Sequence, residues 1–187
     1  MAFVPKKSES DEDEEPVTER SLPSLLVWVP PPGPLDAKTT FSKFESLCKS
    51  KDMLVLVPQS IDPQKWLPDE VSVMAKAVER LGERTPFDRN RIAIAGKDSG
   101  AQMAMLVAFS NRGLFRGVAA IESELSTSVP NVQSLPSQRL RMTAIGDEDN
   151  EKSFQFFREN GFSVFHDADK RNSLRKVCDW LSLLDRL

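Results

Sequence analysis

The chain has 187 residues, of which 40% are hydrophobic, with 25 basic and 28 acidic residues and a formal net charge of −3. This is the size of one domain with enough apolar residues for a core, and no apolar run approaches the ~18 residues of a membrane-spanning helix. No basic patch is interleaved with aromatic residues, which argues against nucleic acid as a partner.

The charge is concentrated at the amino terminus. Residues 1–20 hold seven acids and three bases, which leaves 21 acids and 22 bases in the rest of the chain. The run ESDEDEE at 9–15 cannot bury an apolar face and repels itself. The sequence therefore predicts a disordered linker or tail over 1–20 and a domain over 21–187. MAFVPKKSESDEDEE lacks an apolar signal segment, although a fragment of a larger secreted protein would look the same.

Six continuous apolar runs predict strands buried on both faces, as in a parallel sheet covered by helices. In chain order, these runs are 24–29, 52–60, 91–96, 116–123, 139–146 and 162–166.

Helical spacing of apolar residues separates these runs, and the segment at 124–138, rich in Ser and Pro, is expected to be a loop. The predicted helices are 36–50, 69–82, 100–110, 150–160 and 173–186. This alternation predicts an α/β fold: a three-layer αβα sandwich with a mostly parallel six-stranded sheet. In such sheets, binding sites form where the carboxyl ends of the strands meet their loops.

The cysteines and the histidine give no sign of a metal or cofactor. Cys48 and Cys178 fit no metal or redox spacing, and the chain has one histidine, so we expect no metal site and no cofactor. Two buried thiols are the favoured interpretation, and a disulfide between them stays open.

The stretch RIAIAGKDSGAQMA, 91–104, carries the most specific signal. With its flanks, FDRNRIAIAGKDSGAQMAMLVAFSNRGLFRGVAAIES, it resembles the strand, nucleophile elbow, helix and next strand of α/β-hydrolases of the carboxylesterase, phospholipase and polyhydroxybutyrate-depolymerase kind. The resemblance covers about 22–187. It implies that 24–29 lies beside 91–96, that 52–58 is an edge strand, and that the first two strands of the family are missing. The chain also resembles the carboxyl-terminal hydrolase-like domains of bacterial trypsin-like proteases with PDZ domains, the Do-like family.

The resemblance places Asp98 where these hydrolases carry their serine. An aspartate there can act as a nucleophile in epoxide or halide hydrolysis. The alternative is an acid favoured by the dipole of the following helix. Ser99 stands one place late, and its simplest role is to cap that helix.

The residues expected for the catalytic base, the triad acid and the oxyanion donor match the family poorly. The base in the family lies in the loop after the last strand, whereas the only histidine here, His166, falls several residues early. Asp149, with Asp147 as a second candidate, matches the triad acid, but an acid capping the helix at 150–160 explains it equally well. Pro30-Pro31-Pro32 occupies the loop expected to donate an N–H to an oxyanion, and proline has no N–H.

We therefore expect a catalytically degenerate hydrolase-fold domain. It would serve as a binding or structural module, as the carboxyl-terminal part of a larger exported polypeptide, possibly a protease. Periplasmic or secreted localisation would follow only in that case. Its partner would be another protein or other domains of its own polypeptide. The alternatives are an active hydrolase using Asp98, or an oligomerisation domain whose contact is the 52–58 edge or helix 173–186.

Overall fold

The computed structural model describes residues 2–3, 22–133, 140–146 and 150–184. Most of the predicted tail, 4–20, therefore lies outside the described residues. Within the described part, no helix is long and apolar enough to cross a membrane.

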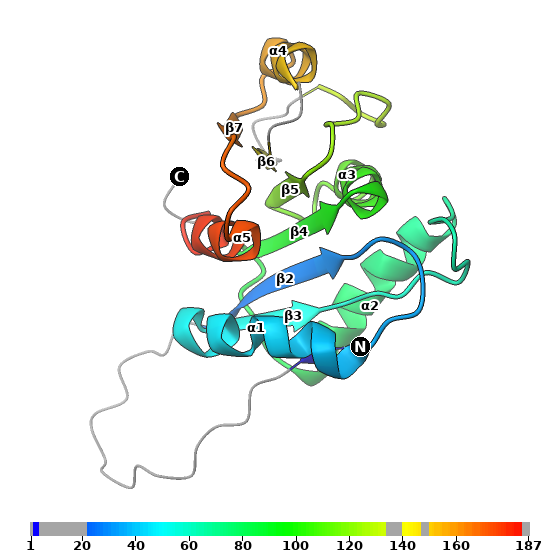
Figure 1. The fold of residues 1–187 in the computed structure, drawn as a ribbon, viewed down its shortest axis with the longest axis vertical. Coiled ribbons are helices and arrows are strands. Elements are labelled where there is room, and N and C mark those ends of the chain that lie inside the picture. Colours follow the sequence, from blue (N-terminus) through cyan, green and yellow to red (C-terminus); the bar gives the residue numbers. More distant parts are fainter. Residues whose placement is uncertain (1, 4–21, 134–139, 147–149, 185–187) are drawn as a thin grey trace, which may run out of the picture.

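The described strands form one sheet in the order β1-β3-β2-β4-β5-β6-β7 (Figure 1). β2 to β7 are parallel, as the continuous apolar runs predict, and each of the strands from β2 to β6 is almost wholly buried. The strands are β1 (Ala2–Phe3), β2 (Ser24–Val29), β3 (Met53–Leu56), β4 (Ile92–Lys97), β5 (Gly117–Ile121), β6 (Arg141–Ile145) and β7 (Val164–Asp167).

The expected edge strand at 52–58 requires a correction. Residues 2–3 pair antiparallel with β3, so β3 has a short neighbour on its outer side. The strand also ends at Leu56, earlier than the predicted end at 60. The sequence prediction missed β1 because two residues carry no periodic pattern.

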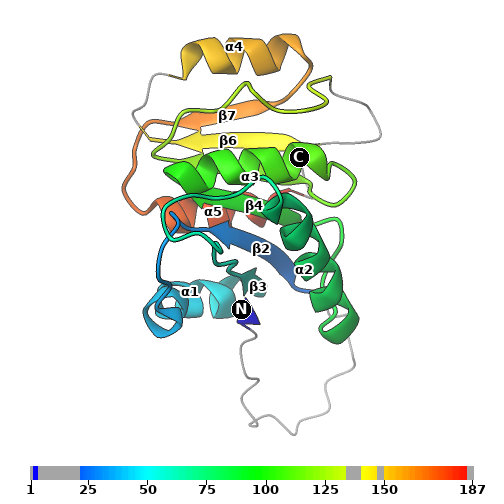
Figure 2. The ribbon, with the colours of Figure 1, turned by 90° about the vertical axis from the view of Figure 1, so that its right-hand side faces the viewer.

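Five helices are described, on both faces of the sheet (Figure 2). They are α1 (Ala37–Lys51), α2 (Glu70–Arg84), α3 (Ser99–Ser110), α4 (Glu151–Glu159) and α5 (Ser173–Leu181). The last helix is shorter than the predicted 173–186, and the other boundaries agree within about two residues, the usual uncertainty.

Two apolar cores confirm the three-layer sandwich. Residues of α2, α3 and α4 pack on one face of the sheet, and residues of α1 and α5 pack on the other. α3 is buried nearly all round, as its sequence predicts, and Phe109 near its end packs against Phe157 and Phe162. The helix therefore holds the end of β4 in a fixed position.

Both cysteines are buried free thiols in the α1–α5 core. Burial raises the pKa of the Cys48 thiol to about 11 and that of Cys178 to about 12, so both are protonated and unreactive at neutral pH. Among the described residues, no group of three or more His, Cys, Asp or Glu side chains could hold a metal ion.

Candidate functional site

The junction of β4 and α3 is a sharp turn at Asp98. Asp98 has φ 51° and ψ −127°, a conformation that L-residues rarely adopt, and α3 begins at the next residue. The turn is possible because two glycines leave room for it. A Cβ on Gly96 would lie 2.2 Å from the carbonyl oxygen of Gly100, and a Cβ on Gly100 would lie 2.3 Å from that of Val29. The strained strand-to-helix turn of a nucleophile elbow is thus present with an aspartate at its tip.

Three consecutive side chains leave this turn in different directions. Lys97 lines one cavity and Ser99 lines another, while Asp98 between them is exposed. The capping role expected for Ser99 is not observed, because Ser99 is the first residue of the helix. The cap position belongs to Asp98, whose side chain makes no capping hydrogen bond.

His166 lies on β7, which is the edge strand at the opposite side of the sheet from β1. Its Nε2 is 2.9 Å from the carbonyl oxygen of Gly146, and its ring packs against the ring of Phe154 on α4, with centroids 4.9 Å apart and the planes tilted by 50°. β5 and β6 separate β7 from β4. Three strand spacings of about 4.8 Å each separate the backbones of β7 and β4 by roughly 14 Å, and the contacts of His166 are with Gly146 and Phe154. The structure therefore does not bring these two residues together.

The two candidate acids, Asp147 and Asp149, lie outside the described residues. The next residue, Asn150, is buried and connects two loops. Its Oδ1 accepts a hydrogen bond from the Leu125 N–H at 2.6 Å, and its side-chain amide donates to the Ser123 carbonyl at 3.5 Å. No local sequence pattern predicts this link, because both loops are irregular and far apart in the chain.

The loop after β2 presents carbonyl groups toward the elbow. The carbonyl oxygens of Val29 and Pro30 stand closest to the position of a Cβ on Gly100. The Trp66 indole N–H donates to the Pro30 carbonyl at 3.0 Å, which ties this loop to the segment before α2. Pro30, Pro31 and Pro32 supply no N–H donor here.

Charged groups from the end of β7, the loop after it and α5 form ion pairs with one another, at the place where the hydrolase family carries its histidine. Lys176 Nζ lies 2.8 Å from Asp167 and 3.2 Å from Asp169, and Arg171 also pairs with Asp169. Hydrogen bonds from Arg171 hold the pKa of Asp169 well below its usual range, and Lys176 lowers the pKa of Asp167. No proton acceptor suited to neutral pH results from this network.

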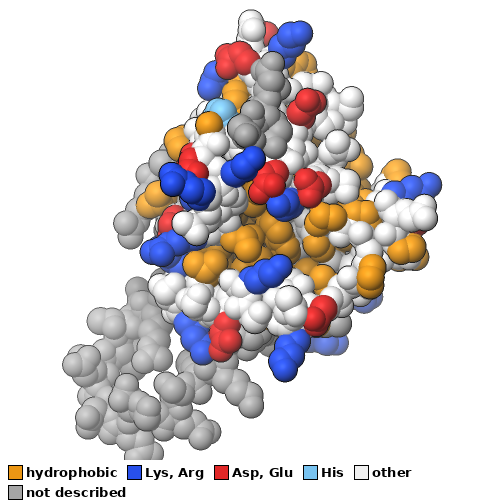
Figure 3. Space-filling model, in the orientation of Figure 1, with side chains coloured by type: hydrophobic (Ala, Val, Ile, Leu, Met, Phe, Trp, Pro, Cys, Tyr) orange, Lys and Arg blue, Asp and Glu red, His pale blue; other side chains and the backbone are white. Residues whose placement is uncertain are grey.

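A cavity of about 620 Å³ opens at the carboxyl ends of β2, β4 and β5, between α1 and the start of α5; we call it the carboxyl-edge crevice. Figure 3 shows an apolar area at the centre of this face with Lys, Arg, Asp and Glu side chains around it. The lining includes the apolar side chains of Trp28, Leu47, Ile121 and Leu174 and the charged side chains of Lys43, Lys97, Glu122 and Arg175.

Lys97 and Glu122 form an ion pair in this crevice, with Nζ and Oε2 2.9 Å apart. Glu122 directly follows β5 and has φ 48°, so the ends of both neighbouring strands turn sharply. The carboxyl ends of these strands are expected places for a site, but nothing in the sequence predicts a role for Lys97 or Glu122. Their pairing depends on the adjacent register of β4 and β5.

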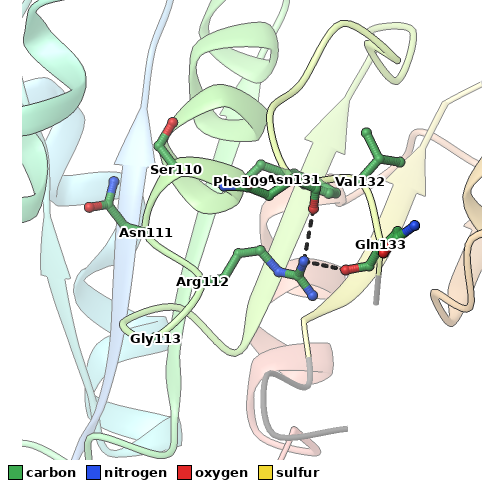
Figure 4. A pocket seen from close by; sticks show the side chains of 8 residues that line it. All are labelled: Phe109, Ser110, Asn111, Arg112, Gly113, Asn131, Val132 and Gln133. Atoms are coloured by element: carbon green, nitrogen blue, oxygen red, sulfur yellow. Dashed lines mark hydrogen bonds between the residues drawn. The ribbon is translucent and has the colours of Figure 1, made fainter. Parts of the chain in front are cut away.

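A second cavity, of about 710 Å³, lies at the other end of α3 from Asp98 (Figure 4). Arg112 is 5% exposed, donates to the carbonyls of Asn131 and Gln133 at 2.8 and 2.5 Å, and lies over the Phe162 ring. These bonds tie the loop after β5 to the turn that follows α3, which makes Arg112 a structural residue.

Comparison with known proteins identifies the fold. No family model and no curated protein matches the chain. Among solved structures, a ferulic acid esterase has a TM-score of 0.66 at 15% identity, over 98% of this chain and 91% of that one. A Rhizomucor miehei esterase has 0.65 at 12%, over 91% and 78%. The Staphylococcus aureus fluorophosphonate-binding serine hydrolase F has 0.63 at 10%, over 97% and 91%.

These structures are esterases and serine hydrolases with the α/β-hydrolase fold, and the chain has this fold. At such low identity the likeness extends to the fold alone. The second resemblance, to the carboxyl-terminal domains of Do-like proteases, has no support among the structures reported above and stays a prediction.

Proposed function

We propose that this α/β-hydrolase-fold chain is a non-catalytic binding module that takes a ligand in the carboxyl-edge crevice. The observation that carries the proposal is the separation of the parts. Asp98 stands exposed at the elbow, and the only histidine of the chain is held by the Gly146 carbonyl three strands away.

Proton transfer needs a base within about 2.6–3.2 Å of the reacting group, or one water further. His166 does not offer its Nε2 to Asp98, because this nitrogen lies 2.9 Å from the Gly146 carbonyl oxygen, on a strand whose backbone is roughly 14 Å from that of β4. The proline loop adds a second defect, because loss of one oxyanion donor costs about 3–4 kcal/mol of transition-state stabilisation. Each defect alone would severely slow ester hydrolysis.

Binding at the crevice follows from the topology. From β2 the chain proceeds through α1 to β3, whereas from β4 it proceeds through α3, on the opposite face, to β5. The strand order therefore reverses between β2 and β4. In doubly wound sheets, ligands bind at the carboxyl ends of the strands at such a reversal, and both strand ends contribute to the crevice.

A second candidate function is a hydrolase that uses Asp98 as its nucleophile, of the ester, epoxide or halide type. The strained elbow favours it, and so do the solved structures with this fold, which are esterases. On the comparisons alone, this candidate is better supported than the binding module. It still requires a base for the hydrolytic water.

The proposal also includes a partner. The module would bind another protein, or other domains of a larger exported polypeptide to which it belongs. A homo-oligomer is the further alternative, and measurement of the molecular mass in solution tests it directly.

Hydrolysis of short-chain nitrophenyl esters separates the two candidate functions. We expect the wild type to give no rate above that of Asp98→Ala. We also expect no measurable activity from Asp98→Ser, because a serine without a nearby imidazole keeps its proton. A robust rate that disappears in Asp98→Ala would overturn the binding-module proposal. Turnover by Asp98→Ser would show that a base and a second oxyanion donor are already in place.

A further inference from the structure

The carboxyl-edge crevice combines an apolar floor with an excess of positive charge. Lys43, Lys97 and Arg175 line it, against a single acid, Glu122, so three positive charges face one negative charge. Glu122 is paired with Lys97, and Arg175 Nε makes only a long, exposed contact of 3.9 Å with Asp179 on its own helix. The Lys43 ammonium and the other N–H groups of the Arg175 guanidinium are therefore left to attract an anion. The site therefore selects for negative charge at its rim.

The first turn of α5 adds to this positive field. It contains Arg175 and no acidic residue, and the side chain of its cap residue, Asn172, makes no capping hydrogen bond. Backbone N–H groups and the helix dipole are positive at this end of a helix. Asn172 to Arg175 line the crevice, so the dipole and the Arg175 guanidinium act on the same space.

The apolar part of the crevice suits a hydrocarbon rather than a sugar or a nucleotide. Trp28, Leu47 and Leu174 come from β2, α1 and α5, and together they form a surface beside the charged rim. A volume of about 620 Å³ lies within the usual range of small-molecule sites. Asp98 does not appear among the described lining residues, so a ligand here is not presented to the elbow.

We propose that the carboxyl-edge crevice binds an aliphatic carboxylate, with the carboxylate between Lys43 and Arg175 and the chain on the floor of Trp28, Leu47 and Leu174. This inference rests on the proposed binding function and names its ligand class. The carboxylate supplies the charge that the rim lacks, and the alkyl chain covers the partly exposed side chains of Leu47 and Leu174 beside the buried Trp28.

Calorimetric titration with octanoate tests the proposal, with octanol as the uncharged probe of the same length. We expect octanoate to bind the wild type more tightly than octanol. Lys43→Ala with Arg175→Ala should weaken octanoate binding by about five-fold or more and leave octanol binding unchanged. The matched control is Lys38→Ala with Lys152→Ala, which removes the same charge from exposed positions of α1 and α4 that do not line the crevice. An equal loss in this control would overturn the proposal, as would octanol binding as tightly as octanoate.

The indole N–H signals of the three tryptophans locate the ligand. Trp28 lines the crevice, whereas Trp66 and Trp180 line other cavities. We expect octanoate to shift the nuclear magnetic resonance signal of Trp28 and to leave the other two in place. A shift confined to Trp66 or Trp180 would place the ligand elsewhere and overturn the proposal.

Parallel ester assays on the same preparations separate this inference from the proposed function. If the protein neither binds octanoate nor hydrolyses esters, the proposed ligand class is overturned and the proposed non-catalytic function is not. Turnover that depends on Asp98 overturns the proposed function, whatever octanoate does.

Discussion

At the scale of single residues, Asp98 has the strained backbone of a nucleophile elbow, although the hydrolase family carries a serine at this position. Conformations of this kind cost about 1–3 kcal/mol and persist only where the surroundings enforce them. Here the enforcing contact is the close approach of α3 to the loop after β2, where Gly100 meets the carbonyls of Val29 and Pro30. The elbow is therefore a property of strand–helix packing and does not depend on the nucleophile.

This packing predicts that Gly100→Ala destabilises the domain. Its Cβ would stand 2.3 Å from the Val29 carbonyl oxygen, with backbone rather than a flexible side chain in the way. We expect a loss of about 3 kcal/mol in the free energy of unfolding, measured with urea. Gly113→Ala is the control, because nothing lies within 4 Å of its added Cβ, and it should change stability by less than about 1 kcal/mol. Equal effects of the two variants would contradict the close approach.

At the scale of elements, a buried carboxylate organises the segment between β3 and α2. Glu70 is 4% exposed and accepts hydrogen bonds from the N–H groups of Ile61 and Leu67, at 2.8 and 2.6 Å, and from the Ser60 hydroxyl at 3.3 Å. The same segment carries Trp66, which holds the Pro30 carbonyl. Glu70 thus fixes one wall of the loop that the hydrolase family uses for its oxyanion donor.

Replacement of this carboxylate by an amide should loosen the whole segment. In Glu70→Gln one acceptor oxygen becomes an NH₂ group that faces an N–H donor. We expect a loss of about 2 kcal/mol in the free energy of unfolding and faster amide hydrogen exchange at Leu67. Glu79→Gln, exposed on the same helix, should have almost no effect on either measurement. Unchanged exchange at Leu67 in Glu70→Gln would show that the carboxylate does not hold the segment.

At the scale of the whole molecule, the sheet has unequal edges. β1 covers β3 through two residue pairs, whereas β7 ends the sheet with Phe165 60% exposed. Almost all of the buried apolar surface belongs to the cores between β2 and β7 and their helices. The stability of the domain should therefore depend little on the amino-terminal segment.

Deletion of residues 1–20 tests this expectation. The variant loses β1, whose single pairing with β3 has two residue pairs and contributes little because such short pairings are marginal in water. We expect the free energy of unfolding to change by less than about 1 kcal/mol. Removal of β1 also uncovers β3, so sedimentation should show more self-association than in the full chain. A loss above about 2 kcal/mol would show that the segment packs on the domain.

The α/β sandwich could be predicted from the sequence because continuous apolar runs and helical spacing are local patterns. The strand order came from the resemblance to α/β-hydrolases, and its edge strand was wrong because β1 pairs with β3. Burial on both faces appears directly in a run such as 24–29, and Gly96 and Gly100 around Asp98 mark the elbow. The absence of a second histidine and the three prolines at 30–32 are also facts of composition. The sequence by itself therefore determined the fold and showed that the elbow carries an aspartate, with one histidine in the whole chain and three prolines in the neighbouring loop.

The tertiary structure alone decided which side chains meet. The pairing of Lys97 with Glu122, the bond of His166 to Gly146, and the convergence of α1 with the start of α5 on one crevice join residues far apart in the chain. Such contacts depend on strand register and on how helices cross the sheet, and neither leaves a periodic trace in sequence. A site built at the carboxyl ends of several strands consequently emerges only when the strands are placed side by side.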